Sequence, residues 1–458
     1  MTDRTTADIA RRSHELRDRS IPDSARTDAR IRLTDTLACL AGGLHSPPAE
    51  VAAKIATTQR SEPPATVLGT GISTSVELAA FANGVAARYL DFNDTFTGPA
   101  SGHPSDMIPA LLAVAESVHA SGKDLLTAIV CAYEAFGAIG KTVKIRARGW
   151  DQGVLIGIGV AAGSALLLGC DLAATEHAIG LAATMAMPTR STRAGALAMW
   201  KGAATAASAR FGVFASTLAA NGMTAPERAI EGKDGLWQQV TGEFAVRPFG
   251  GDEQWVISST AIKLYPLEYN AQIGVELMRQ VRERVRPEDV ASIRVDTYWS
   301  AFDEIGNEPE KWDPRTRETA DHSLPYLLAV SMVDGQVTED SFDAGHLRDP
   351  AIRALMAKVT VHEDAEFTTI WPKAVPCRLT VVRTDGSSHT AQLSYPLGHP
   401  ARPAPPAEIE AKFTRVTGRA FDAERANAAL ETLRRTEELA DVVEIVRLFA
   451  PEGQASHG

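Results

Sequence analysis

A polar stretch of 16 residues, "DFNDTFTGPASGHPSD" from Asp91 to Asp106, holds the strongest candidates for chemistry in this sequence. Three carboxylates, two threonines and one histidine lie between "ELAAFANGVAARYL" and "MIPALLAVAESV", two apolar segments whose spacing predicts packed helices. Loops of this composition are usually solvated turns. A polar loop fixed between two buried helices is a better candidate for a functional site, because rigid elements hold its side chains in place.

His103 is the residue of this stretch best suited to carry a proton near neutral pH. Its neighbours Gly102 and Pro104 fix the backbone on both sides of it. Ser101 and Ser105 flank it, but adjacent residues rarely form the geometry of a serine nucleophile and its base, and the pattern GxSxG is absent. We therefore predict proton transfer by His103, with a purely structural histidine as the alternative.

Two lysines stand in apolar surroundings, Lys201 in "LAMWKGAATAA" and Lys263 in "STAIKLYPLEYN". Such a lysine can extend its ammonium group to the surface, or it can be a buried cation that meets a carboxylate ligand or acts with a lowered pKa. A third candidate is "TADHSLPYLLAV", where Asp321, His322 and Tyr326 surround the start of an apolar helix. The alternative there is a plain helix cap.

The sequence gives little support to a metal or an organic cofactor. Its four cysteines are far apart, and its 11 histidines form no HxH or HxxxH pair. Asp91, Asn93, Asp94 and His103 could bind a divalent cation, but their spacing is not that of a calcium loop. The glycine-rich stretches "GTGISTS" and "GIGVAAG" complete neither the dinucleotide-binding pattern nor the Walker pattern. What remains is acid–base chemistry in a pocket that carries positive charge.

Composition excludes several classes of partner. The net charge of -11 argues against nucleic acid or an anionic membrane, and it leaves room for a small anionic substrate in a locally basic pocket. The first residues, "MTDRTTADIARRSHELRDR", lack the apolar core of a secretion signal, so we expect a cytoplasmic protein with buried, free thiols. The longest uncharged apolar run, Val154 to Cys170, is just short of a membrane span and favours a buried helix.

The elements that must position these side chains divide the 458 residues into three parts. Residues 1–265 show helical spacing nearly throughout and predict a large all-α domain. Residues 266–400 change character, because "VASIRVDTYWSAF", "KVTVHEDAEF" and "CRLTVVRTDGSSHTAQLSYP" alternate as strands do, the last around an Asp-Gly turn, while "LPYLLAVSMVDG" predicts a helix. After the proline-rich "GHPARPAPP", residues 401–458 return to helical spacing. We predict a mainly α protein with a smaller α+β lid, whose C-terminal helices pack back on the helical domain.

Four stretches, taken together and in order, resemble the MmgE/PrpD family. They are "YLDFNDTF…GHPSDMIPALLAVAE", "AMWKGAATAASARFGVFASTLAANGMTAPERAIEGKDG", "AIKLYPLEYNAQ" and "ETADHSLPYLLAVSMVDG", and the likeness extends over nearly the whole chain. That family contains 2-methylcitrate dehydratases, cis-aconitate decarboxylases and related epimerases. The resemblance implies an active site between the helical domain and the lid, a homodimer, and catalysis without metal or organic cofactor.

The resemblance also implies which residues form the site. Carried over position by position, the catalytic ones are Asp91, Thr95, His103, Lys201, Lys263 and Tyr326. The decarboxylases have a further histidine in an RGxH motif, where this chain has "RGWDQG" with Asp151 in that place. That difference weakens the likeness to the decarboxylases. The residues of "MWKG", "KLYPLEY" and "ADHSLPY" resemble the 2-methylcitrate dehydratase branch more closely.

The expected reaction is the removal of water from a tricarboxylate, with conversion of 2-methylcitrate to cis-2-methylaconitate as the leading hypothesis. His103 would transfer the proton, with Asp91 orienting it or acting as its partner, while Lys201 and Lys263 would bind carboxylates or protonate the departing hydroxyl. Tyr326 would donate a hydrogen bond or a proton. Further contacts to the substrate are expected from Arg146, Asp151, Arg190, Arg193 and His322, the arginines as carboxylate clamps.

Two alternatives stay open at this point. The same fold could decarboxylate cis-aconitate, or epimerise or isomerise another dicarboxylate, because all these reactions begin from a similar carbanion. A binding module without catalysis is the other alternative.

Overall fold

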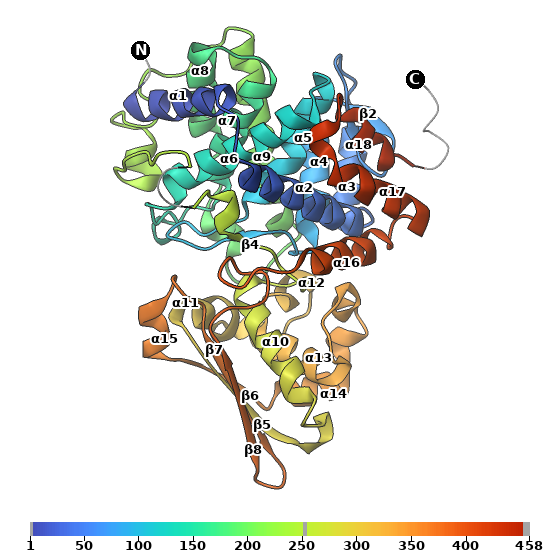
Figure 1. Ribbon diagram of the computed structural model, residues 1–458. Coiled ribbons are helices and arrows are strands. Elements are labelled where there is room, and N and C mark those ends of the chain that lie inside the picture. The colour runs from blue at the N-terminus through green and yellow to red at the C-terminus, as the bar shows by residue number, and fades with distance from the viewer. Residues whose placement is uncertain (1–2, 251–253, 452–458) are drawn as a thin grey trace.

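The chain forms two stacked bodies, a broad helical one and a narrower one that contains the main sheet (Figure 1). This computed structural model describes residues 3–250 and 254–451. Along the chain, the N-terminal elements form the helical body and the middle elements form the narrow body. The last helices return to the helical body. The predicted fold class, mainly α with a smaller α+β part and returning C-terminal helices, is therefore confirmed.

Small residues let the central helices of the larger body approach one another closely. A Cβ atom on Gly212 of α9 would lie 2.5 Å from the carbonyl oxygen of Gly157 in α7, closer than real Cβ contacts allow. The glycine-rich stretch "GIGVAAG" is thus a helix-packing surface. The helices of this part are α1 (Arg4–Asp18), α2 (Asp23–Gly43), α3 (Pro47–Ala56), α4 (Val76–Tyr89), α5 (Ile108–Ser117), α6 (Gly122–Gly140), α7 (Gly153–Leu167), α8 (Leu172–Met185) and α9 (Trp200–Ala220).

Two short strand pairs accompany these helices. Strands β1 (Ala65–Val67) and β2 (Ile72–Thr74) form an antiparallel hairpin whose turn uses Gly69 at φ 76°. Strands β3 (Thr95–Phe96) and β4 (Thr260–Ala261) are also antiparallel. Because β3 lies inside the polar stretch after α4, this second pairing joins that stretch to the segment that leads out of the helical body.

The narrow body packs helices against one face of a four-stranded mixed sheet. The strand order is β6-β5-β7-β8, in which β5 and β6 are parallel and the other neighbours antiparallel. The strands are β5 (Val290–Thr297), β6 (Val359–Glu363), β7 (Cys377–Arg383) and β8 (Ser388–Leu393). The helices are α10 (Tyr269–Arg282), α11 (Trp299–Ala301), α12 (Arg317–Ala320), α13 (Leu324–Asp334), α14 (Pro350–Met356) and α15 (Ala365–Ile370).

Several local predictions are confirmed in this body. All three alternating stretches form strands, and the Asp-Gly pair turns between β7 and β8 with Gly386 at φ 84°. The stretch "LPYLLAVSMVDG" forms α13, which ends at Gly335 in the left-handed conformation. The Asp91–Asp106 stretch, in contrast, is not a simple loop, because it contains β3 and most of its side chains are buried.

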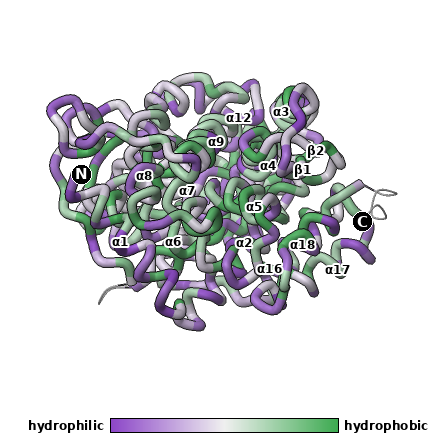
Figure 2. The backbone as a smooth tube through the Cα atoms, turned by 90° about the horizontal axis from the view of Figure 1, so that it is seen from above, coloured by the Kyte–Doolittle hydropathy of each residue, from purple (hydrophilic) through white to green (hydrophobic). Residues whose placement is uncertain are grey.

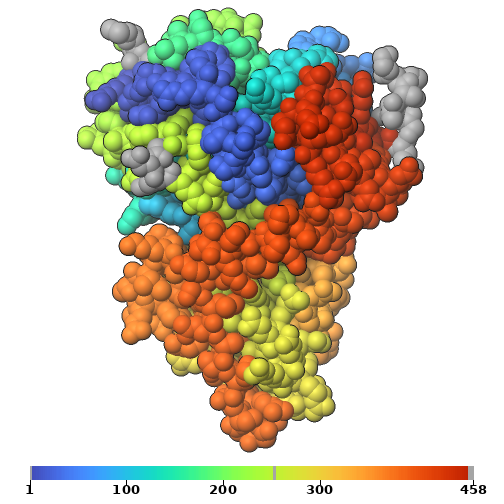
Figure 3. Space-filling model, in the orientation of Figure 1, coloured from blue at the N-terminus to red at the C-terminus, as the bar shows by residue number. Residues whose placement is uncertain are grey.

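The C-terminal helices lie against the helical body (Figure 3), and their apolar side chains join its core. Phe413, Leu433 and Phe449 join the same buried cluster as residues of α2 and α4. Lys412 is also buried: its Nζ atom lies 2.6 Å from Asp35 Oδ1 and donates to the carbonyl oxygens of Phe92 (2.7 Å) and Lys263 (2.9 Å). These helices are α16 (Pro406–Thr417), α17 (Ala423–Arg434) and α18 (Val443–Leu448).

Apolar residues gather in the central helices, and hydrophilic ones lie at the periphery of the helical body (Figure 2). The run from Val154 to Cys170 is mostly the buried helix α7, as predicted. Among the described residues, no helix is both long enough and apolar enough to cross a bilayer. The four cysteines are all buried and free.

Candidate active site

A cavity between the two bodies is lined by polar side chains from both. From the helical body come Asp91, Thr95, His103, Arg146, Asp151 and Arg193. From the narrow body come Glu268, Tyr269, Asn270, Glu304, His322 and Trp371. Segments distant in sequence therefore meet in one place.

Asp91 lies directly after α4 and is held by three cations. Its backbone φ of 50° falls in the left-handed region, which asparagine and aspartate tolerate better than most residues. Arg88 Nη1 lies 2.7 Å from Asp91 Oδ1. The ammonium group of Lys263 bonds the same carboxylate oxygen and donates to the Asp91 carbonyl at 2.9 Å. Although burial opposes ionisation, Arg88, Lys201 and Lys263 hold the pKa of Asp91 well below its usual range.

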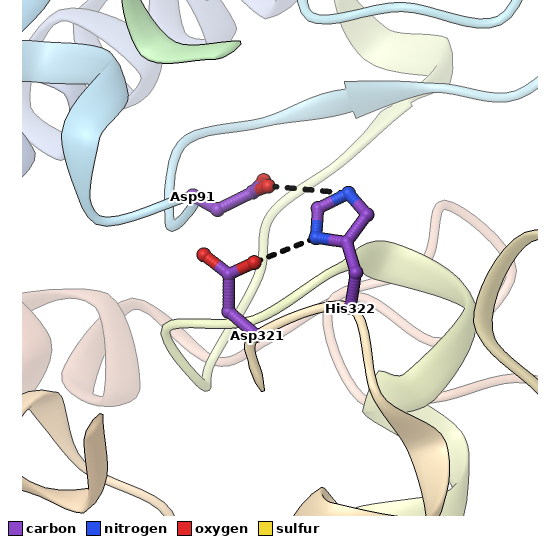
Figure 4. A group of neighbouring side chains, drawn as sticks. All are labelled: Asp91, Asp321 and His322. Carbon is purple, nitrogen blue, oxygen red and sulfur yellow. Dashed lines mark hydrogen bonds and ion pairs between the residues drawn. The ribbon is translucent and has the colours of Figure 1, made fainter. Parts of the chain in front are cut away.

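Lys201 joins Asp91 to the narrow body. Its Nζ atom lies 3.0 Å from Asp91 Oδ2 and 2.7 Å from Asp321 Oδ1. His322 lies against the same two carboxylates, with Nδ1 2.6 Å from Asp321 Oδ1 and Nε2 3.8 Å from Asp91 Oδ2 (Figure 4). Burial and the charge of Lys201 lower the pKa of His322 to about 4, so its ring is neutral at pH 7. Ser323, rather than Asp321, caps α13.

His103 presents one ring nitrogen to the cavity. Its Nδ1 atom lies 2.7 Å from the carbonyl oxygen of Asp94 and 3.2 Å from Oγ1 of Thr95. A carbonyl oxygen can only accept, so Nδ1 carries the hydrogen and Nε2 keeps its lone pair. Burial, with Arg88 and Lys263 nearby, holds the pKa of His103 well below its usual range. The ring is thus oriented by Asp94 and Thr95. That Asp91 is its partner acid or base, the other half of the expectation, stays a prediction.

A buried network fixes the backbone of this stretch. Asp94 accepts from the backbone N–H of Ser105 at 3.0 Å and from the hydroxyl of Tyr133 at 2.8 Å. Asn93 donates to Asp106 Oδ1 at 2.6 Å. Burial raises the pKa of Asp106 to about 6. The polar residues of the stretch therefore form two sets. Asp91, Thr95 and His103 line the cavity. Asn93 and Asp94 make the buried hydrogen bonds that hold the backbone.

The expected carboxylate clamps are already paired with protein carboxylates. Arg193 Nε lies 3.0 Å from Asp151 Oδ2. Arg146 and Arg190 both reach Glu304 of the narrow body, at 3.2 and 3.4 Å. Burial opposes ionisation of Glu304, yet these two arginines lower its pKa to about 2. Asp151 is likewise buried, and Arg193 lowers its pKa.

Of the predicted catalytic residues, Asp91, Thr95 and His103 line the cavity, whereas Tyr326 lies away from it. This tyrosine lies in α13, inside the core of the narrow body, and its hydroxyl donates to the carbonyl oxygen of Ser341. Lys263 is close to the site but fully buried beneath Asp91, with no exposed surface. Of the predicted substrate-binding residues, Arg146, Asp151, Arg193 and His322 line the cavity. Lys201 and Arg190 contact side chains of its wall, Asp91 and Glu304.

Sequence reasoning missed several residues of the cavity. Glu268 and Tyr269 lie inside the quoted stretch "AIKLYPLEYNAQ", so their motif was found but their side chains were not singled out. Arg88 stands three residues before Asp91, and its position could have been noticed. Glu304 and Trp371 carry no local signal, because only the folded chain brings them to the cavity.

Asp91, Asp321 and His322 form a set whose ligand atoms lie within 4.8 Å of one another, as a metal ion would require. The ammonium group of Lys201 already lies among them, 3.0 Å from Asp91, 2.7 Å from Asp321 and 3.3 Å from His322 Nδ1. A divalent ion in that place would have to displace Lys201 and would face Arg88 and Lys263 as well. The donor set therefore fits an ammonium group better than a metal ion.

Two family models match the chain, that of the MmgE/PrpD N-terminal domain over residues 7–248 and that of the MmgE/PrpD C-terminal domain over residues 265–438. The chain belongs to the MmgE/PrpD family, as its motifs predicted.

Among named relatives, a 2-methylcitrate dehydratase of Cupriavidus necator is 29% identical over 399 residues, which cover 80% of each chain. The 2-methylcitrate dehydratase of Escherichia coli (strain K12) is 27% identical over 370 residues, 73% of this chain and 74% of its own. The cis-aconitate decarboxylase-like protein oryM of Aspergillus oryzae is 26% identical over 475 residues, 98% of this chain and 97% of its own. The prediction of a dehydratase-like enzyme, a carbon–oxygen lyase, agrees with the first two.

Proposed function

We propose that this protein is a hydro-lyase that removes water from a tricarboxylate, with 2-methylcitrate as the substrate and cis-2-methylaconitate as the product. One observation carries the proposal: a single cavity joins a neutral histidine, His103, to the cations that a polyanion needs. The names of the two bacterial relatives support the choice of substrate.

His103 is the base in this proposal. Its Nε2 lone pair takes the proton from the carbon that lies beside one substrate carboxylate and next to the carbon that bears the hydroxyl. The hydrogen bond from Nδ1 to the Asp94 carbonyl stabilises the imidazolium that forms. General-base help of this kind contributes about 10² to 10⁴-fold.

Cations in the cavity wall offset the charge that develops on the substrate carboxylate as its neighbouring carbon loses a proton. Arg88, Arg146 and Arg193 line the cavity, and each is now paired with a protein carboxylate. A substrate carboxylate would exchange places with Asp151 or Glu304, so part of the ion-pair energy is recovered when the substrate binds. Lys201 and Lys263 act from behind Asp91 by fixing its position.

Decarboxylation of cis-aconitate is the second candidate, because the fungal decarboxylase-like relative aligns with 98% of this chain. Asp151 stands where that branch has a histidine, and its pairing with Arg193 leaves no proton to donate at neutral pH. This feature favours dehydration over decarboxylation.

A substrate panel tests the proposal directly. Purified, chelator-treated protein is given 2-methylcitrate, citrate or cis-aconitate, while the ultraviolet absorbance of the conjugated product and the release of carbon dioxide are followed. We expect absorbance to rise with 2-methylcitrate, at the same rate with and without chelator. Carbon dioxide from cis-aconitate without that rise would assign decarboxylation instead, and no change with any of the three would refute the substrate.

Tyr269 should contribute to substrate binding. Its hydroxyl and that of Thr97 are in the cavity wall, and neither makes a well-formed hydrogen bond among the described residues. Replacing Tyr269 with phenylalanine should lower kcat/KM about 10- to 150-fold, the value of one hydrogen bond to a charged ligand. The matched control is Tyr265→Phe, because Tyr265 bonds Arg279 outside the cavity. Equal kinetics for wild type and Tyr269→Phe would contradict this role.

The homodimer and the cytoplasmic location stay predictions.

A further inference from the structure

Glu268 is the N-cap residue that directly precedes α10, in the wall of the cavity that belongs to the narrow body. His103 lies in the wall that belongs to the helical body. A substrate between the two bodies would therefore have these side chains on opposite sides. Elimination of water needs this kind of pair, a base for the carbon-bound hydrogen and an acid for the hydroxyl.

The contacts of Glu268 leave one carboxyl oxygen able to carry a hydrogen. Oε2 accepts from the backbone N–H of Asn270 at 2.6 Å. Oε1 accepts only a longer bond from the side-chain amide of Asn270, at 3.1 Å. The amide is itself held by the hydroxyl of Tyr298, and the Glu268 N–H donates to the carbonyl of Asp321 at 2.9 Å. The Glu268 side chain is thus held by these hydrogen bonds, and Oε1 is the oxygen that would carry the proton.

The groups around Glu268 favour its protonated form. Burial, the Glu304 carboxylate and the Asp91 carboxylate raise its pKa to about 8, and Lys263 opposes them only in part. Lys263 is committed to Asp91, while Asp321 faces Lys201 and His322. Tyr298 adds a neutral hydroxyl on the side of β5. A carboxylic acid and a neutral imidazole therefore coexist in this cavity at pH 7, which is how environment assigns acid and base roles.

We propose that Glu268 is the general acid that protonates the departing hydroxyl, an inference that rests on the proposed dehydration. The carbon–hydrogen bond breaks toward His103 Nε2, and its electron pair becomes the new carbon–carbon double bond. The carbon–oxygen bond breaks with its electron pair on oxygen, and the proton of Glu268 Oε1 completes a water molecule. His103 ends with one extra proton and Glu268 with one fewer, and exchange with solvent restores both.

The other candidate donors are less suitable. Lys263 has no exposed surface, and Lys201 is only 3% exposed and bonds two carboxylates at once. Tyr326 donates to Ser341 inside the core of the narrow body. Glu304, the other glutamate of the cavity, is ionised, because Arg146 and Arg190 hold its pKa at about 2.

The test compares two leaving groups in the variant Glu268→Gln. Glutamine keeps an oxygen that accepts from the Asn270 N–H, so the fold is preserved. The substrates are 2-methylcitrate and its analogue in which fluorine replaces the tertiary hydroxyl, since fluoride leaves without being protonated. We expect a loss of about 10² to 10⁴-fold with 2-methylcitrate and less than about tenfold with the fluoro analogue.

The pH profile provides the second readout. Wild-type activity on 2-methylcitrate should fall as the pH rises through about 8, because Glu268 then loses its proton, and this fall should be absent with the fluoro analogue. The variant Glu304→Gln should move this fall to lower pH, because it removes a carboxylate that raises the pKa of Glu268. Equal losses with both substrates in Glu268→Gln would overturn the acid role and leave Glu268 as a positioning residue. Wild type that eliminates neither water nor fluoride would refute the dehydration itself.

Discussion

Replacing His103 with alanine should reduce kcat/KM for 2-methylcitrate by about 10² to 10⁴-fold with little loss of stability. The effect is large because the hydrogen bond from Nδ1 to the Asp94 carbonyl places the hydrogen of the neutral ring on Nδ1, and the lowered pKa of His103 leaves Nε2 with its lone pair. Exchange of the substrate's carbon-bound hydrogen with deuterated solvent should vanish in the same variant. That loss would distinguish a failed proton abstraction from a failed departure of the hydroxyl.

The base His103 should become protonated at a lower pH than an ordinary histidine. A histidine with an ordinary pKa would lose its lone pair as the pH falls through about 6.5. Burial and the nearby Arg88 and Lys263 disfavour the protonated ring, so wild-type activity should persist below that pH. His119→Ala is the control, since His119 is exposed and paired with Asp441. Unchanged exchange in His103→Ala would assign the base elsewhere, with His322 as the first candidate.

Replacing Asp91 with asparagine should destabilise the protein by about 3 to 5 kcal/mol, the usual cost of breaking a buried ion pair. The carboxylate is 1% exposed and is shared by Arg88, Lys201 and Lys263. Asparagine would leave Lys263 without a carboxylate partner among the described residues and Arg88 with only the more distant Asp106 at 3.7 Å, while Lys201 would keep Asp321. Activity should also be lost, because Lys201 and His322 are held in place through the same carboxylate. Denaturant unfolding monitored by circular dichroism measures the first effect, and the substrate panel the second.

The control for this variant is Asp23→Asn. Asp23 pairs with Arg26 at 2.8 Å but is almost fully exposed, and surface pairs contribute about 1 kcal/mol or less. Because the pKa of Asp91 is lowered, its stabilising effect is complete above its unfolded-state value of about 3.9 and disappears only as the pH falls through the lower folded value. A stability loss in Asp91→Asn no larger than that in Asp23→Asn would show that the cluster does not need this charge.

Much of the fold and part of the site could be predicted from local patterns. Alternation and an Asp-Gly turn predicted β7 and β8, and helical spacing predicted α13, because these elements depend on neighbouring residues. His103 and Asp91 were found for a similar reason, since their motifs are contiguous. The pairing of β3 with β4 could not be foreseen, because it joins residues more than 160 positions apart and each strand has two residues.

The direction in which a side chain points could not be predicted from the sequence either. Tyr326 and Glu268 each lie in a motif that pointed to the site, yet the helix geometry turns Tyr326 into the core and the start of α10 turns Glu268 into the cavity. A motif fixes where the backbone passes, whereas the contacts of each side chain depend on the packing of both bodies. The pairing of Arg146 and Arg190 with Glu304 is of this kind, because its partners come from different bodies.

The contacts of Lys412 have a consequence for the order in which the protein is made. Asp35, Phe92 and Lys263 leave the ribosome long before α16, yet the carboxylate and two carbonyl oxygens that they bury meet their cation only when Lys412 arrives. Buried polar groups without partners destabilise a folded structure. In a nascent chain that stops before α16, the Asp35 carboxylate and the carbonyl oxygens of Phe92 and Lys263 would lack the Lys412 ammonium group. We therefore expect the candidate site to be completed only when almost the whole polypeptide is available, and chains truncated before α16 to be inactive.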